Sequence, residues 1–462
     1  MLLLLDDLRS VFSQQRVFER VCRQALGVLF ALGARTVARV LAATGRDQCD
    51  WTTEYRLFSR SPWQTRELFF PIIQRALAFA GAQKEPIVLA GDFTHLAKSG
   101  RHIPGVHCIR DPLSPPFHAN LIYGLRFFQV TVLCPFRDHP PQPLPARSVP
   151  VRFEASPVLA KPGKRATEQE RAAYRKALKQ RLSSVAARQV LEELREDFDR
   201  AGASARPLLV ALDGSFCNQV FFKKAISGVE LVCRCRKDAV LCLPHKSVPE
   251  HKGPKRFYDP RCFTPESVRQ DETISWQSGS FFHGGAFHSI RYKELNSVLW
   301  RKGAGRRLLR LIVIAPTGYR LHQHGRLLYR QAAFLLSTDR DSPIEQLIAA
   351  YLERWQIEVN HREEKSTLGL GDAQLRNPLS VPRQPALVVA AYAMLLLAAL
   401  RAYGPQRTSD YLPSPKWGRA PPRPSLLDIL SLLRKQCHEN PQALECFAVQ
   451  ATALDLVLKA AA

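Results

Sequence analysis

Two short apolar runs, each leading into an aspartate, most strongly constrain the fold of this chain. Residues 87–90 are continuously apolar and lead through a glycine into Asp92, and residues 208–212 lead directly into Asp213. Such runs are typical of strands buried on both faces of a sheet. If the two strands are neighbours, their carboxylates can share the hard cations, such as Mg²⁺, that prefer oxygen ligands. The alternative is that each aspartate only caps the turn after its strand.

The charge of the chain indicates its class of partner. Among 462 residues, 66 Lys and Arg stand against 41 Asp and Glu, which leaves a net charge of +25. Such an excess favours a polyanionic partner, most often nucleic acid, over a merely solvated basic surface. The hydrophobic share of 46% excludes wholesale disorder. The 11 cysteines include no Cys-x2-Cys pair, so we expect reduced thiols in a cytosol and no zinc site of ordinary spacing.

The middle of the chain contains both strand and helix signals. Residues 120–134 are rich in β-formers and predict two strands in a hairpin, and the Pro-rich residues 139–162 predict a loop. Thr167 and Glu170 have the spacing of a capping box, which predicts the start of a helix that ends near residue 201.

The remaining segments differ in composition. Residues 1–82 have helical periodicity followed by mixed aromatic and basic residues, which predicts a small helical module that either contacts DNA or packs as a bundle with basic ends. Residues 229–335 are β-rich and irregular. The uncharged apolar residues 386–400 are too few for a membrane span and predict a core helix.

Four polar residues near position 358 share a helical pattern. Tyr351, Arg354, Glu358 and Lys365 follow the spacing Tyr-x2-Arg-x3-Glu-x6-Lys. At 100° per residue they fall within an arc of roughly 60° on one helix face. Glu358 would supply a metal ligand, Arg354 and Lys365 would bind phosphates, and Tyr351 would bond a phosphate or support a displaced base. The alternative is an exposed face with ion pairs between successive turns.

With Asp92 and Asp213, this pattern resembles the DDE transposases of bacterial insertion sequences, in particular the group with the Tyr-Arg-Glu-Lys signature. The spacing of the four residues matches that signature without a gap. One departure is that Phe93 stands where the family commonly has Thr or Ser after the first aspartate.

The resemblance implies an α/β fold: a ribonuclease-H-like mixed sheet with flanking helices and a β-rich insertion, a helical N-terminal domain and a mostly helical C-terminal region. We expect five segments. They are a helical, DNA-binding N-terminal domain (1–82), the first part of the core with Asp92 and Asp213 (83–228), the β-rich insertion (229–332), the second part of the core with the Glu358 helix and the apolar helix (333–403), and a Pro-rich linker with a helical tail (404–462).

The resemblance also implies a reaction. Asp92 would bridge two Mg²⁺ ions, with Asp213 on one and Glu358 on the other, and Mn²⁺ is the expected substitute. The activity would be cleavage of DNA at the ends of an insertion sequence and joining of the 3′-hydroxyl ends to target DNA, that is, cut and paste. Two alternatives are a ribonuclease-H-like nuclease that cuts without joining and an inactive DNA-binding protein derived from a transposase. Relatives hold a flipped base against a Trp of the insertion, for which Trp276 and Trp300 are the candidates.

Partners and location follow from the same resemblance. The partner is double-stranded DNA, both the terminal inverted repeats of the element and the target, with a homodimer in the synaptic complex. The chain starts without the basic segment or the length of a signal peptide, so we expect a cytoplasmic, nucleoid-associated bacterial protein and no membrane.

Overall fold

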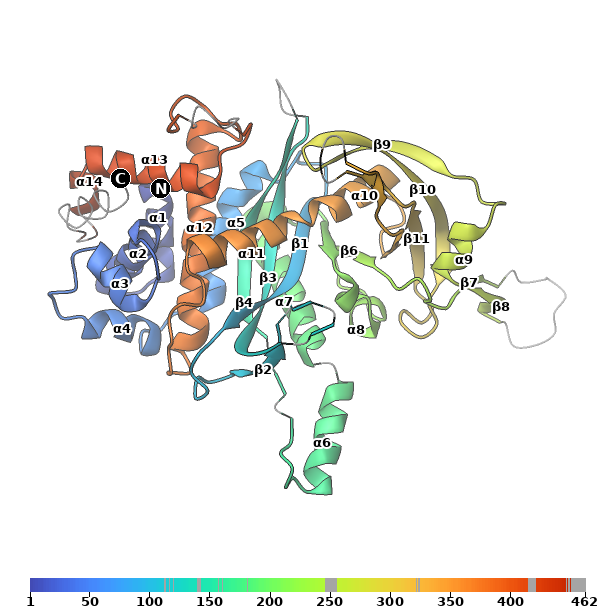
Figure 1. The fold of residues 1–462 in the computed structure, drawn as a ribbon, viewed down its shortest axis with the longest axis horizontal. Helices are drawn as coiled ribbons and strands as arrows, with labels where there is room; N and C mark the ends of the chain where they lie inside the picture. The colour runs from blue at the N-terminus through green and yellow to red at the C-terminus, as the bar shows by residue number, and fades with distance from the viewer. Residues whose placement is uncertain are drawn as a thin grey trace.

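A single mixed sheet runs through the computed structural model and carries helices around it (Figure 1). The structure describes residues 1–449 apart from 112–113, 116, 119, 139–142, 157, 160, 181, 246–255, 321, 323–324, 414–420, 446 and 448. Within this part, the strand order is β2-β3-β1-β5-β6-β14-β11-β10-β7-β8, with β4 added on β3 and β9 on β10. The strands are β1 (Ile87–Ala97), β2 (His107–Arg110), β3 (Leu121–Phe136), β4 (Leu144–Ala155), β5 (Leu208–Leu212), β6 (Val229–Arg234), β7 (Leu241–Pro244), β8 (Tyr258–Phe263), β9 (Gln277–His283), β10 (Ala286–Leu299), β11 (Leu308–Ile314) and β14 (Ala333–Ser337).

The first half of the sheet has the mixed strand directions that the site depends on. Strand β1 is antiparallel to β3 and parallel to β5, and β5 is parallel to β6. All five residues of β5 are buried, as its continuously apolar sequence predicts. This large mixed sheet with its helices is consistent with a ribonuclease-H-like nuclease fold.

Two predictions about this region are wrong. Residues 121–136 form one long strand, β3, rather than a hairpin. The partner of β3 is β4, which lies inside the Pro-rich segment 139–162 that the sequence predicts as a loop. Strand β4 pairs only with β3, so it is an edge strand, where a missing backbone N–H is tolerated. Its register also shifts next to Pro150, which is where an irregular pairing accommodates a proline.

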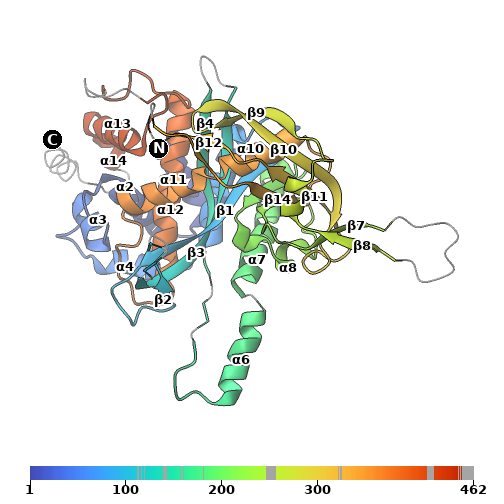
Figure 2. The same cartoon turned by 45° about the vertical axis from the view of Figure 1, so that its right-hand side comes forward.

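The capping box at Thr167 and Glu170 is confirmed, but the expected single helix is divided in two. Helix α6 (Glu168–Lys179) buries no residue and projects from the body, whereas α7 (Leu182–Phe198) packs beneath the sheet (Figure 2). The two helices differ in what they can bury, because α7 supplies an apolar stripe and α6 is polar around most of its surface.

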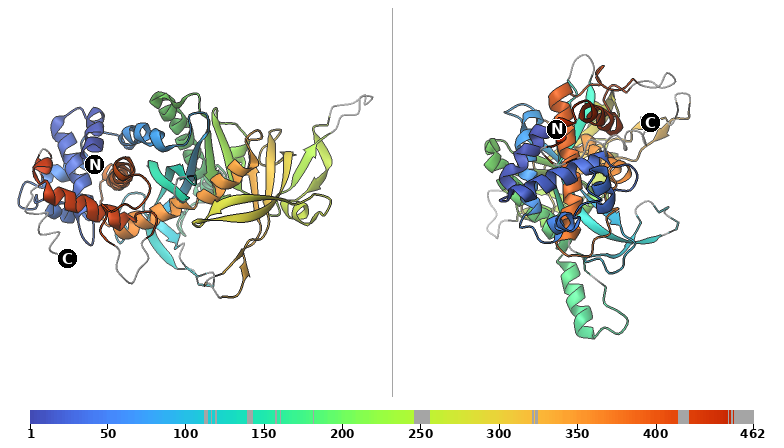
Figure 3. Two further views of the ribbon diagram at one scale, coloured as in Figure 1. Left: turned by 90° about the horizontal axis from the view of Figure 1, so that it is seen from above. Right: turned by 90° about the vertical axis from the view of Figure 1, so that its left-hand side faces the viewer.

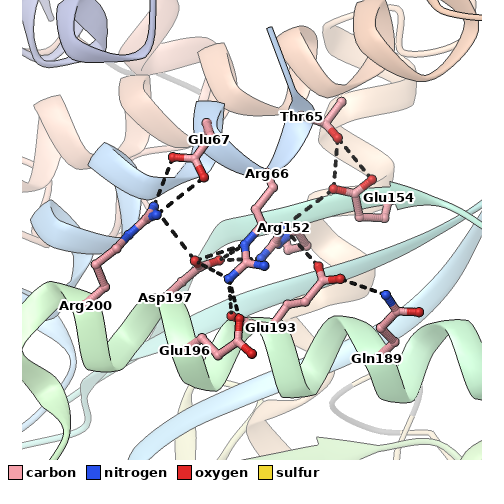
Figure 4. Close-up of polar contacts among 10 residues, drawn as sticks. All are labelled: Thr65, Arg66, Glu67, Arg152, Glu154, Gln189, Glu193, Glu196, Asp197 and Arg200. Carbon is pink, nitrogen blue, oxygen red and sulfur yellow. Dashed lines mark hydrogen bonds and ion pairs between the residues drawn. The ribbon is translucent and has the colours of Figure 1, made fainter.

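A buried ion cluster joins α7 to the sheet and to α5 (Thr65–Ala76) (Figure 4). The fully buried guanidinium of Arg152 on β4 and the half-buried one of Arg66 on α5 both pair with Asp197 on α7, which is 1% exposed. Glu154 and Glu193 lie within 3.7 Å of Arg152 and complete its surroundings.

The β-rich residues after β6 extend the same sheet rather than forming a second one. Strand β14 pairs with β6 on one side and with β11 on the other, and β9 and β10 form a long hairpin. A separate two-stranded ribbon consists of β12 (Gly318–Tyr319) and β13 (Leu328–Tyr329). Two short helices accompany these strands: α8 (Gln219–Phe222) lies between β5 and β6, and α9 (Pro265–Gln270) lies between β8 and β9.

The N-terminal helices and the C-terminal helices pack together at the opposite end of the molecule from β7 and β8 (Figure 3). They are α1 (Leu2–Asp6), α2 (Gln15–Phe30), α3 (Val37–Ala43), α4 (Thr52–Ser59), α5, α12 (Ser380–Tyr403), α13 (Leu426–Glu439) and α14 (Gln442–Glu445). Of the described helices, α12 alone is long and apolar enough to cross a membrane, but 78% of its most apolar stretch is buried inside the protein. It is therefore placed as a core helix, as its sequence predicts.

Candidate active site

The two aspartates lie side by side at the same edge of the sheet. The parallel pairing of β1 and β5 runs from Ile87 and Leu208 to Gly91 and Leu212, and the next residue on each strand is Asp92 and Asp213. Asp92 stays within β1, while Asp213 precedes the short turn of residues 214–216. Parallel strands in this register therefore bring together two carboxylates that are more than a hundred residues apart in the sequence.

The helix that carries the other four predicted residues is not continuous. It is divided into α10 (Ile344–Glu353), α11 (Gln356–Arg362) and a π-helical turn over Glu363–Thr367. The backbone of Arg354 keeps right-handed helical angles between the first two segments, so Tyr351 and Glu358 stay on a nearly common axis. Lys365 lies in the wider π turn, where 100° per residue no longer holds, so the spacing of a regular α-helix does not fix the direction of this residue.

Arg354 connects the sheet to the helix. Its Nη1 lies 3.3 Å from Oδ2 of Asp92, and its Nη2 donates to Oε1 of Glu358 at 3.1 Å. Asp213 lies close enough to repel the charges of both Asp92 and Glu358. The structure thus brings Asp92, Asp213, Arg354 and Glu358 into one cluster.

The surroundings of this cluster raise the pKa of two of its carboxylates, Asp92 and Glu358. Burial raises the pKa of Asp92 to about 6, and repulsion by Asp213 and Glu358 adds to this effect. Arg354 and the backbone N–H of Phe93, which donates to Asp92 at 2.7 Å, oppose the rise in this pKa. Burial also raises the pKa of Glu358, again opposed by Arg354. A bound cation would relieve the same excess of negative charge.

The donor set fits a hard divalent cation, because it consists of carboxylate oxygens alone. As the side chains stand, the described part of the chain has no group of three acidic, His or Cys side chains that could hold a metal ion. At this site the guanidinium of Arg354 is paired with Asp92 and Glu358. A cation at these carboxylates would compete with that guanidinium.

Tyr351 and Lys365 lie on opposite sides of this cluster. Burial raises the pKa of Tyr351, and its hydroxyl lies near the charges of Arg234, Arg354 and Asp213. Burial lowers the pKa of Lys365, and the negative charges of Glu364 and Asp92 oppose that shift. Both residues therefore lie within electrostatic range of the carboxylates: Tyr351 of Asp213, and Lys365 of Asp92. Within the described part of the chain, neither forms an ion pair with them.

A cavity of about 590 Å³ opens beside Tyr351 and Arg354. Arg234 at the end of β6, Arg330 and the tip of the β9–β10 hairpin at His283 complete its basic lining. These three residues were not singled out from the sequence, because they come from three separate segments and share no spacing. The only signal for them was the overall excess of basic residues in the chain.

The two tryptophans considered for a flipped base lie elsewhere. Trp276 packs under Lys293, whose Nζ is 4.7 Å from the ring centre, and Trp300 packs edge-on against Phe222. Neither is among the residues that line the cavity, where Phe282 and Trp355 are the large apolar side chains.

Lys98 is also explained by the structure. Its side chain is buried and donates to the carbonyl oxygens of Gly371 at 2.6 Å and Ala373 at 2.8 Å. It therefore fixes the turn after the π-helical segment.

A family model matches most of the chain. Residues 9–307, well over half of the chain, match the model of a family described as DDE superfamily endonuclease. The matched region includes Asp92 and Asp213 and ends before Glu358. No curated protein matches the chain.

Proposed function

Because the chain belongs to the DDE superfamily of endonucleases, we propose that it is a transposase that cleaves DNA at the ends of an insertion sequence and joins the 3′-hydroxyl ends to target DNA. Membership of the family itself implies a nuclease whose substrate is DNA. Cut-and-paste strand transfer, and a place in the group with the Tyr-Arg-Glu-Lys signature, are the finer parts of the proposal.

The observation that carries the proposal is the ion-paired cluster of Asp92, Arg354 and Glu358 with Asp213 beside it. We assign the three carboxylates as the ligands of two Mg²⁺ ions, with Mn²⁺ as a substitute. When bound, the ions supply activation of the attacking oxygen and stabilisation of the leaving oxygen. Burial makes the ionised form of Asp92 and Glu358 less favourable, and a bound cation would offset that cost.

We assign the basic and aromatic side chains around the carboxylates to DNA. When it is not paired with Asp92 and Glu358, the guanidinium of Arg354 would bind a phosphate with two parallel hydrogen bonds. Lys365 and Tyr351 flank the carboxylates and would contact the backbone on either side of the cleaved bond. The proposal also includes DNA contact by residues 1–82, a homodimer in the synaptic complex and a cytoplasmic, nucleoid-associated location.

A nuclease that cuts without joining is the second candidate, because the matched family is described as an endonuclease. The test uses the inverted repeats that flank the coding region as a labelled duplex, with a supercoiled plasmid as target and Mg²⁺ present. A transposase gives cleaved ends and labelled plasmid. Cleaved ends without labelled plasmid identify the nuclease, and no cleavage under these conditions, with binding intact, identifies the inactive DNA-binding protein.

A further inference from the structure

Residues 161–180, which we call the arm, form the most isolated part of the described structure. The arm contains α6, and none of its residues is buried. It projects away from the sheet beyond α7 (Figures 1 and 2). Because none of its residues is buried, the arm gains little stability from packing against the body of the protein. A helix of 12 residues is marginal in water without such packing.

The arm is also strongly basic. It contains seven Lys and Arg and two Asp and Glu, so 7 − 2 = +5, a fifth of the net charge of +25 in 20 of 462 residues. The acidic residues lie in the first turn, where Glu170 completes the capping box and Glu168 pairs with Arg175. The basic residues Lys176 and Lys179 in the last turn are exposed, and no ion pair is described for them.

The base of the arm lies near the segment that follows Asp213. A cavity of about 490 Å³ is lined by Leu178 of the arm, by Ser183 at the start of α7 and by Arg126 of β3. Ser215 and Asn218, in the segment that follows Asp213, line the same cavity. The arm therefore leaves the body next to the segment that follows Asp213.

On the proposed function, which this inference extends, we propose that the arm binds the phosphate backbone of the DNA duplex that flanks the cleaved bond, without regard to base sequence. Along its axis α6 spans about 18 Å, and duplex DNA offers one phosphate charge per about 1.7 Å of axis. Several basic side chains can therefore reach separate phosphates at once. A second copy of the chain is a poorer partner, because two arms of charge +5 repel each other and Leu178 is the only exposed large apolar side chain on the arm.

The test compares two triple variants of the full chain. The arm variant carries Arg175→Gln, Lys176→Gln and Lys179→Gln, and the matched control carries Lys84→Gln, Arg401→Gln and Lys435→Gln. All six side chains are exposed, and the control residues lie outside the arm and the candidate site. Gln forms helices about as well as Lys and Arg, so α6 should persist, which circular dichroism checks.

The measurement is the slope of log K against log salt for binding to a labelled duplex of arbitrary sequence without Mg²⁺. We expect the arm variant to lose about 0.9 of slope for each phosphate contact removed, up to about 2.7, and the control to lose less than one contact. If the two variants have equal slopes and the wild type has a steep slope, the inference that the arm binds DNA is overturned, but the proposed function is not. A flat slope for the wild type overturns both. A change of sedimentation in the arm variant without a change of slope assigns the arm to a second copy and also overturns the inference.

Discussion

At the scale of single residues, Arg354 links the carboxylates of the candidate site. Its guanidinium neutralises part of the charge of Asp92 and Glu358, which come from different elements. A guanidinium in this position stabilises the neighbouring carboxylates and would compete with a cation for them. These two effects can be separated by experiment.

Arg354→Gln should lower the thermal stability of the metal-free protein and enlarge the stabilisation given by Mg²⁺, because the carboxylates lose their internal cation. Arg354→Lys should resemble it in part, since an ammonium group lacks the planar fork that reaches both carboxylates. The measurement is the melting temperature with and without Mg²⁺. Arg310→Gln is the control, because it breaks a buried ion pair with Glu294 far from the site. An equal response to Mg²⁺ in the wild type, Arg354→Gln and Arg310→Gln would contradict this role.

Glu364 is a second residue with an unusual environment. It is fully buried, and its Oε1 accepts from Nε2 of Gln129, the cross-strand neighbour of Asp92, at 2.8 Å. In the described structure the other oxygens of both side chains have no hydrogen-bond partner. A proton on Glu364 Oε2 would donate to Gln129 Oε1 and satisfy both, which agrees with a pKa raised by burial to about 8.

The free energy of unfolding should therefore fall as pH rises from about 4.5 to about 8. The unfolded chain releases the proton of Glu364 above its ordinary pKa of 4.5, whereas the folded protein keeps it until about pH 8. Glu364→Gln keeps a neutral side chain and should flatten this part of the profile. Urea unfolding at a series of pH values measures it. Identical slopes for the two proteins would show that Glu364 is ionised in the folded state.

At the scale of elements, the cluster around Asp197 joins α5, β4 and α7 (Figure 4). Helix α7 leads into β5 and so helps to set the position of Asp213. Arg152 is fully buried, so the removal of its partner leaves an uncompensated charge inside the protein.

Asp197→Ala should therefore lower the free energy of unfolding by about 3–5 kcal/mol. Glu196→Ala is the matched control: Glu196 also pairs with Arg66 but is 69% exposed, and such pairs contribute about 0–1 kcal/mol. Urea denaturation of the two variants gives the comparison. A similar loss in both would mean that the buried pair contributes no more than a surface pair.

Predictability from the sequence also differs between elements. Apolar runs predict β1 and β5 because burial on both faces requires continuous hydrophobicity, and the capping box predicts the start of α6 because its residues act locally. Strand β4 was missed because its prolines are permitted only by its edge position, which is a property of the whole sheet. The π turn at Glu363–Thr367 was missed because no local spacing encodes it.

The same distinction holds at the candidate site. Asp92, Asp213 and Glu358 could be selected from the sequence. Each aspartate follows an apolar run, and Glu358 belongs to a specific spacing of polar residues. Their common surroundings depend on strand register and on the ion pairs of Arg354, which no local pattern contains. The roles of the selected residues in catalysis and DNA binding stay predictions.

At the scale of the whole molecule, the net charge of +25 should dominate the affinity for DNA. Each neutralised phosphate contributes about −0.9 to the slope of log K against log salt. We expect a slope that corresponds to several phosphates per protomer, measured by titration of the wild-type protein with duplex DNA at increasing salt. A nearly constant affinity across the salt series would contradict the assignment of DNA as the partner.

The central claim is that Asp92, Asp213 and Glu358 together carry Mg²⁺-dependent cleavage. The most direct test is the single-turnover cleavage of a labelled element end by Asp92→Asn, Asp213→Asn and Glu358→Gln, each beside the wild type and with DNA binding measured in parallel. These substitutions keep the shape of the side chain and remove one metal-binding oxygen charge. The account predicts that each variant binds the DNA and that none cleaves it. Near-normal cleavage by any one of the three variants would contradict the account.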